Sequence, residues 1–193
     1  LLRPLELQMQ LFNTSINNAI NREEGTINGS DSMMYDGKMM RIQMNKNIEE
    51  ANIHGLSIST KILATKNILI SSSCNYLSGY TKDKKPLAHI PPFNAKLSFN
   101  YKIKQHTFNF YTHYSAWKIE KKYDLAGVDN LIEATADGNP SWCTLNLVYL
   151  CKIDNNINFT FSIKNILDVH YKTFGSGLSA SGRNYILALQ TKF

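Results

Sequence analysis

Long stretches of this sequence alternate between apolar and polar residues, and this pattern constrains the fold more than any other feature. In 93–103 every odd-numbered residue is apolar or aromatic, and every even-numbered residue is Asn, Lys or Ser. The same alternation runs through 156–164, with Ile and Phe on one face. A period of two places successive side chains on opposite faces of a β-strand, so the sequence predicts strands rather than helices.

Eight segments are predicted as strands. They span about residues 4–19, 41–63, 67–79, 93–103, 106–117, 141–153, 156–165 and 183–193. Short polar turns between them alternate with long connections, which lie at about 21–40, 80–92, 118–140 and 166–181. Each strand therefore neighbours the next one along the chain, in an antiparallel up-and-down sheet. No linker divides the chain, and we expect residues 1–193 to form one region.

A soluble sheet would also alternate, but three details favour a transmembrane β-barrel. Six of the eight predicted segments have about 10–13 residues, the length of a tilted strand that crosses a bilayer, whereas globular strands average about 5–6 residues. Tight turns at one end and long loops at the other are typical of outer-membrane barrels. The faces opposite the apolar rows carry Asn, Ser, Thr and Lys, which suits a watery lumen.

Composition excludes several other classes of protein. The longest fully apolar run, Leu147–Cys151, is far shorter than the ~18 residues of a membrane helix. The three cysteines match no zinc or redox spacing, and the five histidines are scattered. Nucleophile and nucleotide-binding motifs are missing, so we expect no enzyme, metal site or cofactor. The formal charge of +6 comes from scattered lysines, which argues against a nucleic-acid partner.

Four short motifs follow one another along the chain. They are Asn47–Leu56 with Gly55, His89–Ala95 with Pro91 and Pro92, Asn165–Tyr171 with Asp168, and Ser181–Tyr185 with Gly182 and Arg183. Together with the C-terminal Phe193, they resemble the C-terminal barrel portion of TonB-dependent outer-membrane receptors, particularly the Bacteroidetes type. Ser57 departs from the family, which carries Glu there. The resemblance implies about eight strands of a 22-stranded barrel, without the plug domain.

The resemblance also implies a function. Receptors of this family take up a scarce ligand, such as an iron-siderophore or a cobalamin-like compound, across the outer membrane of Gram-negative bacteria. The implied partners are outer-membrane lipid, the TonB energy-transducing complex and an extracellular small ligand. The motif residues are expected to be structural, because prolines start strands and Asn or Asp side chains bind nearby backbone in turns.

The connection 118–140 is the best candidate for ligand binding. It contains Tyr123, Asp124 and Asp129 and lies between Trp117 and Trp142. Carboxylates and aromatic rings on an outer loop suit a cationic or metal-chelate ligand, although the loop would equally serve to cover the barrel mouth. The alternation places His113 on the lumen face, as a ligand contact or as an ordinary polar residue.

Two other interpretations remain open at this stage. In a self-contained eight-stranded barrel, the two edge strands would pair with each other and close the sheet, and the role of the protein would be structural or adhesive. A soluble β-sandwich binding module is the third. Because the sequence starts at Leu1 without an initiating Met, we expect a fragment of a longer gene product or a decayed gene.

Overall fold

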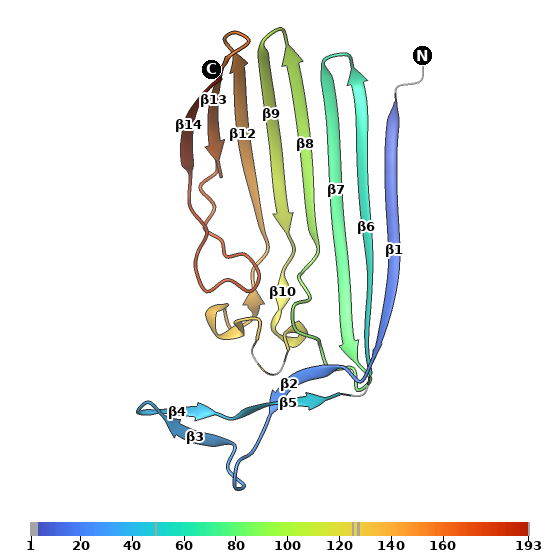
Figure 1. Cartoon of the computed structure of the whole chain (residues 1–193), viewed down its shortest axis with the longest axis vertical. Helices are drawn as coiled ribbons and strands as arrows, with labels where there is room; N and C mark the ends of the chain where they lie inside the picture. The colour runs from blue at the N-terminus through green and yellow to red at the C-terminus, as the bar shows by residue number, and fades with distance from the viewer. Residues whose placement is uncertain (1–3, 49, 125, 127, 193) are drawn as a thin grey trace.

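The computed structural model describes residues 4–48, 50–124, 126 and 128–192, and its main element is one antiparallel sheet of eight strands (Figure 1). The strands, in their order across the sheet, are β1 (Leu5–Asn17), β6 (Glu50–Thr65), β7 (Ile68–Thr81), β8 (Asn94–Ile103), β9 (His106–Ser115), β12 (Trp142–Lys152), β13 (Ile157–Lys164) and β14 (Asn184–Thr191). Every neighbouring pair is antiparallel. The predicted all-β, up-and-down architecture is confirmed.

The register of the strands joins the predicted apolar rows into one face. A single row crosses the whole sheet through directly paired residues: Leu5, Ile62, Ile70, Phe99, Phe110, Leu147, Ile163 and Tyr185. The next row lies on the opposite face and is mostly polar: Glu6, Lys61, Ser71, Ser98, Tyr111 and Asn146. One face of the sheet is therefore mostly apolar, although Thr60, Ser72 and Thr112 interrupt the row through Leu7, and the other face is mostly polar.

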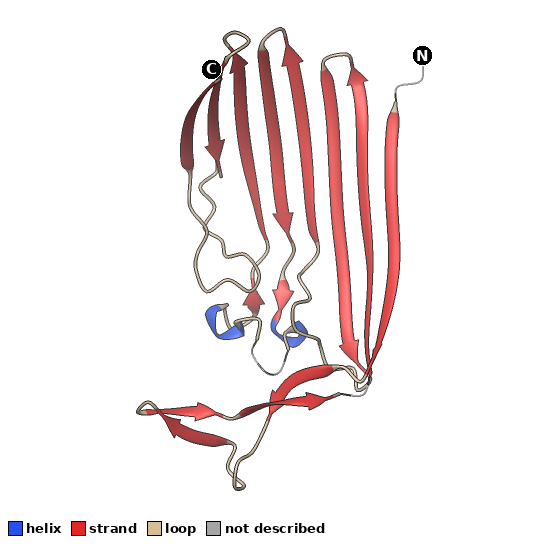
Figure 2. Ribbon diagram, viewed as in Figure 1, coloured by secondary structure: helices blue, strands red, loops and turns tan. Residues whose placement is uncertain are grey.

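The sheet is open at both edges. In the part of the chain that the structure describes, β1 pairs only with β6 and β14 only with β13 (Figure 2). The described strands thus form an open sheet, and the closed eight-stranded barrel of the alternative interpretation is not formed. Among the described residues, no helix is long and apolar enough to cross a membrane.

The predicted strand 41–63 is wrong at its beginning. The chain instead forms β2 (Ile20–Glu24) paired with β5 (Gln43–Asn47), and β3 (Ser32–Tyr35) paired with β4 (Lys38–Arg41). The backbone N–H of Ile48 donates to the Ala19 carbonyl, 2.8 Å away, between this ribbon and the β1–β6 pair. Ile42, Met44 and Ile48 keep the same period of two as Leu56, Ile58 and Ile62, so the sequence pattern suggested one strand where the structure has two.

The tight turns lie at one end of the sheet and the long connections at the other (Figure 1). The long connection after β9 is itself structured, with β10 (Lys118–Ile119) paired to β11 (Gly138–Asn139). Two 3-10 turns, η1 (Glu120–Lys122) and η2 (Leu131–Glu133), complete it. This end of the molecule, called the loop end below, carries most of the residues that the sequence singled out.

Candidate functional site at the loop end

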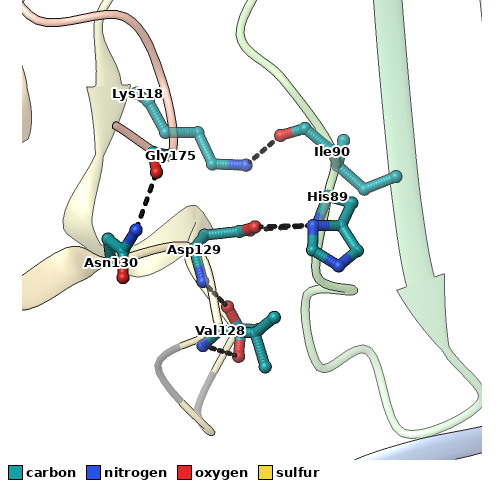
Figure 3. A network of polar contacts seen from close by, with 8 residues as sticks. His89, Ile90, Lys118, Val128, Asp129, Asn130 and Gly175 are labelled. Carbon is teal, nitrogen blue, oxygen red and sulfur yellow. Dashed lines mark hydrogen bonds and ion pairs between the residues drawn. The ribbon is translucent and has the colours of Figure 1, made fainter. Parts of the chain in front are cut away.

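Asp129 ties the connection after β9 to the connection before β8. Its two carboxylate oxygens accept the backbone N–H of His89, each at 3.0 Å, and the His89 ring nitrogen Nδ1 lies 3.2 Å from Oδ1 (Figure 3). His89 has a φ of 62°. This left-handed conformation is uncommon for a residue with a side chain, and it belongs to the segment that precedes Pro91 and Pro92. Asp129 therefore holds a bent backbone segment in place.

Lys118 places a cation beside this carboxylate, inside the packed loops. Only 3% of the residue is exposed, and its Nζ donates to the Ile90 carbonyl (Figure 3). Nζ also lies 4.9 Å from the centre of the Phe174 ring and 5.6 Å from that of Tyr123. Burial lowers the pKa of Lys118, and the carboxylate of Asp129 opposes this shift. Burial likewise raises the pKa of Asp129, against the hydrogen bond from His89.

The other predicted loop residues also turn inward. The Asp124 carboxylate accepts the backbone N–H groups of Val128 and Asp129 at 3.0 and 3.2 Å. Tyr123 is 3% exposed, and burial, followed by the charge of Asp129, raises its pKa. These side chains bind the chain's own atoms in this arrangement, so their predicted contact with a ligand stays a prediction. Trp117 differs, because it is 45% exposed while its Nε1 donates to the Asp137 carbonyl.

Asn165 fixes the connection between β13 and β14. Its side-chain oxygen accepts the Val169 N–H at 3.0 Å, and its Nδ2 donates to the carbonyls of Val169 at 2.8 Å and Ser181 at 3.4 Å. Its own N–H donates to the side-chain oxygen of Asn146 in β12 at 2.9 Å. Asn165 has a φ of 51°, a conformation that Asn tolerates better than most residues.

Asp168 and Arg183 close the same connection from its other side. Oδ1 of Asp168 accepts the Arg183 N–H at 2.7 Å, and Nε of Arg183 donates to the Ile166 carbonyl at 2.8 Å. A Cβ placed on Gly182 would lie 2.7 Å from the same Asp168 oxygen. Glycine is therefore the residue that fits at this close approach. The third and fourth sequence motifs, about fifteen residues apart, thus form one hydrogen-bonded unit.

The rings of Trp142 and Tyr171 lie in tilted contact beside a cavity among the loops, and Tyr171 also lines a second cavity. Their ring centres are 4.3 Å apart, and the His113 ring meets Trp142 edge-on at 4.9 Å. The first cavity, of about 240 Å³, lies beside Glu133, His170 and the rings of Trp142 and Tyr171. Trp142 Nε1 is buried with no hydrogen-bond partner among the described residues.

The second cavity opens on the polar face of the sheet. It measures about 350 Å³, and its lining includes His113, Tyr171 and Lys164. The Lys164 Nζ donates to the Tyr111 hydroxyl and lies 4.8 Å from the centre of that ring. His113 therefore does lie on the polar face, beside hydroxyl, amide and ammonium groups. These groups could bind an anionic or hydrogen-bonding ligand. Alternation places Lys164 and Tyr111 on the same polar face as His113, but it gives no sign that they line one cavity with it.

The remaining motif residues lie away from these cavities or outside the description. Gly55 lies in β6, where the Phe12 ring of β1 covers it: a Cβ there would be 2.5 Å from Phe12 Cζ. Pro91 and Pro92 lie just before β8, separated from it by Phe93, and Phe193 lies outside the described residues. No group of three or more His, Cys, Asp or Glu side chains within the described ranges is arranged to hold a metal ion.

Comparison with solved structures identifies the fold. The copper transporter OprC superimposes with a TM-score of 0.77 at 16% identity, over 98% of this chain and 29% of that chain. The siderophore receptor PirA from Acinetobacter baumannii gives 0.70 at 17%, over 98% and 30%. A mutant ferric enterobactin receptor, PfeA from Pseudomonas aeruginosa, gives 0.72 at 15%, over 98% and 29%.

The present chain thus spans less than a third of the length of these proteins, and at such identities the likeness shows the fold alone. Together with the open sheet, it confirms the predicted fold class, a part of a larger antiparallel β-barrel. No family model matches the sequence, and no curated protein matches it.

Proposed function

We propose that this chain is the C-terminal barrel portion of an outer-membrane transport receptor that is energised through TonB. The observation that carries the proposal is the apolar row that crosses all eight strands, from Leu5 to Tyr185, opposite a mostly polar face. A wall with one lipid-facing and one water-facing side is what an outer-membrane barrel requires. The structural match over 98% of the chain to transport proteins and receptors supports the same role.

The proposed cargo is a scarce metal-containing compound, such as an iron-siderophore or a cobalamin-like molecule. Names of the structural neighbours mention copper, ferric enterobactin and siderophores, which supports a metal complex as the class of ligand. The four sequence motifs support a receptor of the Bacteroidetes type in the outer membrane of a Gram-negative bacterium. An uptake receptor of this kind is not an enzyme.

We place the first ligand contacts at the exposed Trp117 ring and at the polar-face cavity, which His113 lines while its ring contacts Trp142. Tyr123, Asp124 and Asp129 would meet a ligand only after the connection that contains them has moved, because each is buried now. The loops would then serve both as a cover and as a second set of contacts.

Fractionation and iron uptake together test the proposal. We expect the native gene product in the outer-membrane fraction, with a gel mobility that changes on heating. Deletion of the gene should reduce accumulation of ⁵⁵Fe supplied as a ferric catecholate siderophore, and a protonophore should reduce wild-type uptake to the same level. Recovery of the protein in the soluble fraction without detergent would contradict the proposal.

A pair of variants tests the first contact. Trp117→Ala should weaken uptake, whereas Trp117→Phe, which keeps an aromatic ring at the exposed position, should retain most of it. Equal uptake by the wild-type protein and the alanine variant would refute the proposed ligand contact at Trp117, but it would not contradict the transport role.

A further inference from the structure

A small hairpin in the first long connection carries most of the protein's methionines. It consists of β3 and β4, and it projects away from the eight-stranded sheet (Figure 1). The sequence contains six methionines, and four of them lie in this hairpin, as Met33-Met34 on one strand and Met39-Met40 on the other. The register sets Met33 opposite Met40 and Met34 opposite Met39.

The turn explains why the hairpin forms. Asp36 and Gly37 connect the two strands, with φ values of 48° and 72°. Two consecutive residues with positive φ are typical of the type I′ turn, which matches the twist of a two-residue hairpin and favours Asp-Gly. The turn thereby fixes the register that pairs the methionines.

All four methionine side chains are accessible. Met33 and Met40 are 47% and 49% exposed, and Met34 and Met39 are 62% and 67% exposed. Residues directly opposed in an antiparallel pair have Cβ atoms about 4.5–5.5 Å apart. The unbranched thioether side chain has three rotatable bonds, so the two sulfurs of a pair can approach one point. Each pair is therefore a potential two-sulfur site.

The two pairs lie on opposite faces of the ribbon, because neighbouring residues of a strand point to opposite sides. A docking surface for another protein would need its apolar side chains on one face. Paired sulfurs on both faces instead suit two small ligands that each bind a cross-strand pair.

The charges around the hairpin favour a cation. Arg41 is paired with Glu24 at 2.8 Å, which leaves its charge compensated. The remaining charged groups of 31–41 are Asp31, Asp36 and Lys38. This set contains one more carboxylate than cation, so a positive ion is not repelled.

We propose that each methionine pair binds a soft monovalent metal ion, with copper(I) as the natural ligand. Thioether sulfur is a soft ligand that selects copper(I), whereas magnesium and calcium ions need oxygen ligands. The binding itself is independent of the transport role, and only its place at the outer surface of the cell rests on the proposed function.

Silver(I) is the probe, because it is a soft monovalent ion that does not oxidise in air. The full chain is labelled with ¹³C at the methionine methyl groups, and silver(I) is titrated into the protein in detergent micelles. We expect the methyl signals of Met33, Met34, Met39 and Met40 to shift. Signals of Met9, on the apolar face of β1, and of Met44, which packs against Gly25, should stay in place. Magnesium should shift none of them.

Leucine variants separate sulfur chemistry from apolar contact, since leucine keeps a similar volume without the thioether. Met34→Leu should abolish the response of Met39 and leave the Met33 and Met40 signals responsive. The fourfold leucine variant should lose the hairpin response entirely.

Unchanged silver binding by the fourfold variant would overturn the proposal, as would a Met39 response that survives Met34→Leu. A shift confined to Met9 or Met44 would overturn it too. Failure of the outer-membrane fractionation would instead refute the transport role and leave the metal site standing.

Discussion

Asn165→Ala should open the connection between β13 and β14 without disturbing the sheet. The wild-type side chain makes three hydrogen bonds to the backbone of Val169 and Ser181, and the residue is only 3% exposed. Alanine removes all three and leaves the N–H and carbonyl of Val169 without their partner. Alanine must also adopt the left-handed backbone conformation of φ 51°.

The size of the effect follows from these two losses. Each lost hydrogen bond costs about 1 kcal/mol net, and the bond of 3.4 Å is the weakest of the three. A left-handed conformation costs alanine roughly 1 kcal/mol more than it costs asparagine or glycine, the residues that adopt it most readily. The free energy of local opening should therefore fall by about 3 kcal/mol, which is roughly a 150-fold increase in the open population.

Hydrogen exchange followed by mass spectrometry measures this opening peptide by peptide. Amides of 166–182 should lose protection by about that factor, whereas peptides of β9 and β13 should not change. Asn165→Gly is the matched control, because it loses the same hydrogen bonds but not the conformational penalty. Its effect should be about fivefold smaller, since roughly 1 kcal/mol is returned.

Two results would refute this reasoning. Equal protection of 166–182 in the wild-type protein and Asn165→Ala would mean that the side chain does not hold the connection. A glycine variant as open as the alanine variant would mean that the left-handed conformation carries no cost there.

Three further predictions concern neighbouring contacts. Gly55→Ala should destabilise the β1–β6 pair by about 1–3 kcal/mol, because the added Cβ would overlap the Phe12 ring. Urea unfolding should show a smaller loss of stability from Gly55→Ala when Phe12 is also replaced by alanine. Gly182→Ala should displace the Asp168 carboxylate and expose the Arg183 amide to exchange, and adding it to Asp168→Ala should cost little more. Burial raises the pKa of Asp129 in the closed connection, so binding of a proton to Asp129 favours the closed state. The hydrogen-exchange protection of 118–140, corrected for intrinsic exchange, should therefore be highest at a pH near or below 3.8, the ordinary pKa of aspartate. The protection should fall as the pH rises through the raised pKa of Asp129. Asp129→Asn should abolish that pH dependence.

The strands could be predicted from sequence because a period of two is a local property. The predicted segment 93–103 became Asn94–Ile103, and 156–165 became Ile157–Lys164. A strand with one lipid-facing side must repeat its pattern at every second residue, and register then aligns the rows of all strands. The same locality explains the error at 41–63, since alternation does not say which strand is the partner.

The hairpin of β3 and β4 was missed although its signal was present. Asp36-Gly37 between two short apolar pairs is a strong hairpin pattern, but its strands have only four residues each. Strands this short are not long enough to cross a membrane, and they fall within the predicted connection 21–40.

The loop residues could not be placed because their partners are far away in the sequence. His89 and Asp129 are 40 residues apart, and Lys172 and Glu133 are 39 residues apart. Aspartate in a polar connection is normally solvated. Nothing near Asp129 in the sequence indicates that its carboxylate will accept a hydrogen bond from the bent backbone at His89. Which carboxylates face a ligand is therefore decided by tertiary packing.

These distant contacts also constrain how the loop end can respond to a ligand. The connection after β9 is bound on one side to His89 and on the other to the connection after β13, through Asn130 to the Gly175 carbonyl at 2.7 Å and Lys172 to the Glu133 carbonyl at 2.7 Å. Lys118 could not move out of the packed loops by itself, because the buried carboxylate of Asp129 would then lack its neighbouring cation. A ligand that draws any one of these side chains outward must therefore loosen the others. The loop end should accordingly move as one unit rather than as three separate loops.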